Sequence, residues 1–92
     1  MTTHFRVGAA STGPAGNGAA CAFEAAEAAV EALARAGAGL VVLPELFALP
    51  YVAGEDPAGW QHLAETLDGP TARWAADLSR RLDISILFGT AL

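Results

Sequence analysis

The apolar run from Leu40 to Leu43, followed directly by Pro44 and Glu45, is the feature that most constrains the fold of this chain. Consecutive apolar, mostly branched residues are typical of a short strand that is buried on both faces. Proline cannot donate to a central ladder, so we expect the strand to end at Pro44. Glu45 then follows the carboxyl end of the strand, where open α/β sheets place their ligands. We therefore expect its carboxylate to point into a concavity.

Segments of strand and helix character alternate along the rest of the chain. The sequence predicts strands at 5–11, 40–43 and 84–88, and longer helices at 19–36 and 71–82. This order predicts an α/β fold with a parallel sheet, right-handed crossovers and both helices on the same side of the sheet.

The helices are placed by the spacing of their apolar residues. The expected buried faces are Phe23, Ala26, Val30 and Leu33 in the first long helix, and Trp74, Leu78 and Leu82 in the second. A shorter helix is expected to begin at Asp56-Pro57 and to bury Trp60, Leu63, Ala64 and Leu67.

Several single residues carry smaller predictions. Gly37 is expected to end the first helix, and Phe47 is expected in the core. Cys21 is interpreted as a small buried structural thiol. On the outer face of the last helix we expect the ion pairs Arg73–Asp77 and Asp77–Arg81.

Size, charge and cysteine content exclude several classes of protein. The 92 residues suffice for one small domain, and the net charge is −5. The five basic residues are scattered arginines, which argues against a nucleic-acid partner. We see neither a membrane span nor a secretory signal. A single cysteine suits a reducing compartment, so we expect a cytoplasmic protein with no membrane partner.

Residues 37–47, which end in Pro44-Glu45-Leu46-Phe47, resemble the first catalytic motif of the carbon–nitrogen hydrolase (nitrilase) superfamily. Tyr51 matches a tyrosine that follows this motif in the family. Residues 67–70 are similar to the family's Gly-Pro before a helix, and residues 84–89 are similar to its third strand. The resemblance implies that residues 1–92 are the N-terminal segment of one incomplete domain. Its fold class would be the N-terminal part of a four-layer α-β-β-α sandwich.

The same resemblance implies a Glu–Lys–Cys triad, in which the Glu is the general base toward the cysteine thiol. Only Glu45 maps to this triad, because the chain contains no lysine and Cys21 does not match the nucleophile. Tyr51 is a candidate for the substrate pocket, and its neighbour Pro50 favours a small amide or carbamoyl substrate over a nitrile. No metal or cofactor is implied, and the complete protein is expected to be a homo-oligomer. The isolated chain is expected to be inactive.

Two other classes of function stay open. Residues 12–19 resemble the Gly-rich loop of a Rossmann dinucleotide-binding unit, in which Glu45 would bind a ribose hydroxyl. Ala19 in place of the last glycine, Pro14 within the loop and the long spacing to Glu45 count against this interpretation. The incomplete triad also permits a non-catalytic interaction module.

Overall fold

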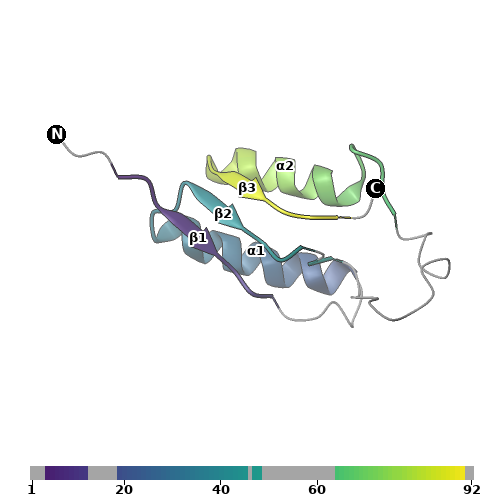
Figure 1. Cartoon of the computed structure of the whole chain (residues 1–92), viewed down its shortest axis with the longest axis horizontal. Coiled ribbons are helices and arrows are strands. Elements are labelled where there is room, and N and C mark those ends of the chain that lie inside the picture. The colour runs from purple at the N-terminus through teal and green to yellow at the C-terminus, as the bar shows by residue number, and fades with distance from the viewer. Residues whose placement is uncertain (1–3, 13–18, 46, 49–63, 91–92) are drawn as a thin grey trace.

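The computed structural model describes residues 4–12, 19–45, 47–48 and 64–90, which form a parallel α/β unit (Figure 1). The elements follow in the order β1 (Val7–Ala9), α1 (Ala19–Arg35), β2 (Leu40–Val42), α2 (Pro70–Leu82) and β3 (Ser85–Leu87). The sheet order is β1-β2-β3, and both strand pairs are parallel. The α/β fold and the parallel arrangement predicted from the sequence are confirmed.

The strands are shorter than predicted, but their hydrogen bonds continue beyond the strand ends. The Gly39 amide donates to the Arg6 carbonyl at 2.9 Å, and the Ala10 amide donates to Val42 at 3.0 Å. On the other side of β2, the Leu43 amide donates to Leu87 at 2.9 Å. The backbone pairing therefore spans most of the segments that the sequence predicts as strands.

A single core lies between the sheet and the two helices. Ala26 and Val30 of α1, Val41 of β2 and Leu78 of α2 are all buried and belong to one apolar cluster. Because both helices pack on the same side of β2, they cover the same face of the sheet, as predicted. The partly buried members of the cluster include the other residues expected on the helix faces: Phe23, Leu33, Trp74 and Leu82.

The end of α1 and the start of α2 both follow what the local sequence favours. Gly37 has φ +98°, and its amide donates to Ala34 while the Ala38 amide donates to Leu33, each at 3.0 Å. This pattern is a Schellman motif, which needs a left-handed residue and therefore favours glycine. At the start of α2, Pro70 occupies the first turn, where a missing amide hydrogen does no harm.

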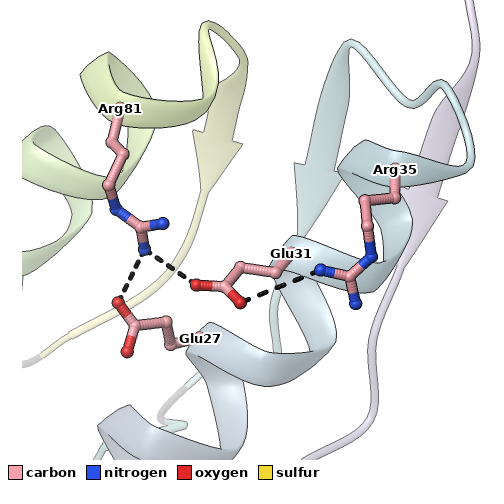
Figure 2. Close-up of polar contacts among 4 residues, drawn as sticks. All are labelled: Glu27, Glu31, Arg35 and Arg81. Atoms are coloured by element: carbon pink, nitrogen blue, oxygen red, sulfur yellow. Dashed lines mark hydrogen bonds and ion pairs between the residues drawn. The ribbon is translucent and has the colours of Figure 1, made fainter.

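An ion-pair cluster joins the outer surfaces of α1 and α2 (Figure 2). The Arg81 guanidinium donates to the Glu27 carboxylate at 2.8 Å and to the Glu31 carboxylate at 2.9 Å. Arg35 lies 4.0 Å from Glu31. The predicted pair Asp77–Arg81 is therefore wrong: Arg81 reaches across to the other helix, and Asp77 pairs with Arg80 instead.

The second face of the sheet is not covered by the residues that the structure describes. Val7 and Leu87 are each 58% exposed, and Leu40 and Val42, which point to the same face, are only half-buried. Strand side chains alternate between faces, so Val41 is buried under the helices while its neighbours lie on this open face. Apart from Ser85, the strand residues on this open face are apolar.

Two expectations are corrected. Cys21 is exposed rather than buried, because the buried side of α1 runs through Ala22, Ala26 and Val30 and Cys21 lies beside that stripe. Residues 64–67 are not helical, and Leu67 is 80% exposed, because a turn at 67–68 precedes α2. The rest of the predicted short helix, from Asp56 to Leu63, lies outside the described residues.

None of the helices within the described ranges is long and apolar enough to span a membrane.

Candidate active site

Glu45 follows β2 at the carboxyl edge of the sheet, where the apolar run indicates that it should lie. Leu43 still donates to Leu87, and the chain then turns away from the sheet at Pro44 and Glu45. Glu45 is exposed, which differs from the expectation that its carboxylate points into a concavity. The described elements cover only one face of the sheet, so they do not enclose this edge.

Gly89, just beyond β3, packs directly against the backbone of Glu45. A Cβ atom on Gly89 would overlap the Glu45 carbonyl oxygen, and it would lie 2.9 Å from the carbonyl carbon and 3.1 Å from Cα. These separations are too short for real side-chain contacts, so only glycine allows the two segments to meet in this way. The chain segments that follow β2 and β3 thus touch at the candidate active site.

Phe47 anchors the turn that carries Glu45. Its side chain is 2% exposed, which confirms the prediction that it belongs to the core. The Phe47 ring centroid lies 5.2 Å from that of Trp74, 6.1 Å from Phe23 and 6.2 Å from Phe88. Aromatic pairs at these separations add to the stabilisation from burial. An aromatic cluster from α1, α2 and the segment after β3 therefore holds the chain two residues beyond Glu45.

A second carboxylate, Glu65, lies in a hydrogen-bond network at the start of α2. Its Oε1 accepts from the Thr71 amide at 2.7 Å, and its Oε2 accepts from the Thr71 hydroxyl at 2.6 Å. Oε2 also accepts from the Thr90 hydroxyl at 3.0 Å. Gly69 permits this approach, because a Cβ there would lie 2.9 Å from the Glu65 Cβ. Glu65 thus supplies the helix cap that Gly69, at the N-cap position, has no side chain to provide.

The hydrogen bonds of Glu65 also set its ionisation. Desolvation by burial is the largest single influence and raises the pKa, but hydrogen bonds from Thr71 and Thr90, with the charge of Arg73, outweigh it. The pKa of Glu65 therefore lies below its usual value, and the carboxylate is charged at neutral pH. Sequence reasoning missed this residue. A glycine at the N-cap before Pro70 was the available signal, since it leaves the helix amides in need of an outside acceptor.

A cavity of about 320 Å³ lies next to this network at the same edge of the sheet. Phe88, Gly89 and Thr90 line it on one side, and Thr66, Leu67 and Ala72 line it on the other. Gly89, which lines this cavity, also packs against the Glu45 backbone.

Most of the remaining predicted positions lie outside the part of the chain that the structure describes. Tyr51 lies outside the described residues, as does most of the Gly-rich segment at 12–19. Among the described residues, no three side chains of the His, Cys, Asp or Glu type gather where they could hold a metal ion.

Comparison with known proteins identifies the family. A family model described as carbon-nitrogen hydrolase matches residues 9–92, and no curated protein matches the chain. The matched region includes all of the elements that surround Glu45, and it disfavours the dinucleotide-binding alternative. Because the match spans most of the sequence, this chain belongs to the carbon–nitrogen hydrolase family.

Proposed function

We propose that Glu45 is the general base of a Glu–Lys–Cys hydrolase that cleaves non-peptide carbon–nitrogen bonds. The observation that supports this role is the position of Glu45 at the carboxyl edge of a parallel sheet, with its backbone against Gly89 and its turn anchored by Phe47. A base must be held in place to act on a thiol, and packing on both sides provides that restraint.

In this proposal Glu45 takes the proton of a cysteine thiol, and the thiolate attacks the carbon of the scissile bond. The amine leaves with a proton, and water then releases the acyl group from sulfur and regenerates the thiol. The lysine stabilises the negative charge that develops on the substrate. The 92 residues contain no lysine, and Cys21 does not match the family nucleophile, so the lysine and the cysteine would both come from residues outside them. No cofactor takes part in this scheme.

The substrate that we propose is a small amide or carbamoyl amine rather than a nitrile, because Pro50-Tyr51 is similar to the pair in members that resemble carbamoyl-amine amidases. We also propose that the open face, which carries Val7, Leu40, Val42 and Leu87, packs on a second sheet in the complete domain. Such packing would give the four-layer α-β-β-α sandwich and would remove this apolar face from water.

The test is the rate of ammonia or amine release by a protein in which residues 1–92 are joined to the segment that carries the lysine and cysteine. Glu45→Gln should lower kcat by at least about a thousandfold while circular dichroism and the melting temperature stay unchanged. Glu24→Gln, which changes an exposed carboxylate on α1, is the matched control and should leave the rate unaltered. Full activity in Glu45→Gln would overturn the proposal. A panel of amide, carbamoyl amine and nitrile substrates decides the bond type.

A further inference from the structure

The segment that follows β3 makes three consecutive contacts, each with a different part of the candidate active site. Phe88 packs its ring on Phe47, with centroids 6.2 Å apart. Gly89 lies against the Glu45 carbonyl, and the Thr90 hydroxyl donates to Glu65 at 3.0 Å. We call residues 88–90 the post-β3 segment. The position of this segment determines how closely the Gly89 backbone packs on Glu45.

Capping of α2 does not account for the bond between Thr90 and Glu65. The Thr71 amide alone supplies the helix-terminal donor, and it binds Oε1. The bond from Thr90 to Oε2 joins the loop before α2 to a residue 25 positions further along the chain. A bond to an ionised carboxylate is stronger than one between neutral groups. Glu65 can therefore hold the post-β3 segment through Thr90 while it caps α2 through Thr71.

We propose that Glu65 is a positioning residue for Glu45, and that it acts through Thr90 and Gly89. Glu65 holds the Thr90 side chain, Thr90 fixes the adjacent Gly89, and Gly89 sets the location of the Glu45 carbonyl. The importance of this chain of contacts for catalysis rests on the proposed role of Glu45 as the general base. The contacts themselves can be tested without any measurement of enzymatic activity.

Amide hydrogen exchange on the 92-residue chain is the direct test, read residue by residue by mass spectrometry with fragmentation. The Leu43 amide, bonded to Leu87, reports on the carboxyl edge beside Glu45. The Gly39 and Ser85 amides, bonded to Arg6 and Gly39, report on the opposite edge of the same sheet. These internal references separate a local effect from a general loss of stability.

Thr90→Val removes the hydroxyl at nearly constant shape, and Thr90→Ser keeps it. In Thr90→Val we expect exchange at Leu43 to rise about tenfold, which suits the loss of one bond to a charged acceptor, while Gly39 and Ser85 change little. Thr90→Ser should exchange like the parent chain. Glu65→Gln should show the same rise at Leu43 and in addition loosen the first turn of α2. Glu27→Gln, which alters the ion-pair cluster, is the control and should leave exchange at Leu43 unchanged relative to Gly39 and Ser85.

The proposal is overturned if Thr90→Val leaves exchange at Leu43 unchanged, if Thr90→Ser fails to restore it, or if every sheet amide accelerates equally. Where the chain is part of an active hydrolase, Thr90→Val should lower kcat with little change in KM, and Thr90→Ser should recover it. An unchanged kcat there would also count against positioning. The proposed function itself is judged separately by Glu45→Gln, so the two ideas can fail independently.

Discussion

Replacement of Gly89 by alanine should destabilise the carboxyl edge of the sheet. The new Cβ would overlap the Glu45 carbonyl oxygen and would lie 2.9 Å from the carbonyl carbon, whereas ordinary contacts begin at 3.4 Å. The two backbone segments must therefore move apart by more than 0.5 Å, the difference between these two distances, because the carbonyl oxygen lies closer still. Neither partner is a flexible side chain that could swing away, because both atoms belong to backbone.

The expected cost of this overpacking is about 1–3 kcal/mol. For a chain of this length, such a loss lowers the melting temperature by about 5–20 °C. In an active hydrolase, a shift of Glu45 approaching 1 Å would also reduce the rate by about a hundredfold. Urea denaturation followed by circular dichroism measures the free energy of unfolding directly.

Gly8→Ala is the matched control. Its Cβ would meet the methyl groups of Leu33 at 3.0 and 3.1 Å, and these lie at the end of a side chain that can move. Alanine also restricts the unfolded chain in the same way at both positions, so the free energy of unfolding in Gly8→Ala should stay within about 1 kcal/mol of the parent. A Gly89→Ala chain as stable as the parent, or less affected than Gly8→Ala, would refute the argument.

Three further predictions concern the pH dependence of stability, the activity of the isolated chain and its association in solution. Folding lowers the pKa of Glu65, so its contribution to stability is present above the usual value of 4.5 and is lost as the pH falls through the lower folded value. Urea titrations between pH 7 and pH 3 measure the difference in stability between the parent and Glu65→Gln. This difference should stay constant near neutrality and shrink only below about pH 4.5. The isolated chain should release no ammonia from amides, carbamoyl amines or nitriles, and steady turnover that Glu45→Gln abolishes would contradict this. The open face with Val7 and Leu87 should make the isolated chain associate, which sedimentation and binding of a hydrophobic dye would detect; a sharp monomer with a cooperative melt would instead favour a self-sufficient interaction module.

Local patterns in the sequence were sufficient to predict most of the fold. The apolar run at 40–43 has the composition of a buried strand, and Val41 is fully buried under the helices, while Leu40 and Val42 on the open face are half-buried. Gly37 ends α1 because its positive φ is a local requirement. The placement of both helices on one side of the sheet follows from crossovers that share one allowed hand.

The sequence predictions fail where a residue's burial cannot be judged from its type alone, or where its contact partner is distant in the chain. Cys21 was expected to be buried because free cysteines usually are, but it lies beside the buried stripe of α1 that runs through Ala22, Ala26 and Val30. Arg81 pairs with Glu27 and Glu31 of α1, which the spacing of charges along its own helix cannot indicate. The bond from Thr90 to Glu65 joins residues 25 positions apart, and the contact of Gly89 with Glu45 depends on how β2 and β3 align. Of the candidate site, the sequence predicted Glu45 and Phe47 but not the groups that hold them.

The order of the strands in the sheet also bears on how this chain is made. Strands that are consecutive in the chain are neighbours in the sheet, so β1 and β2 can pair as soon as β2 has left the ribosome, without waiting for a later strand. β3 then adds to an existing edge. Glu45 emerges during synthesis well before Gly89 and Thr90, so its turn gains its final support only when β3 docks. The candidate site is therefore complete only once β3 has joined the sheet.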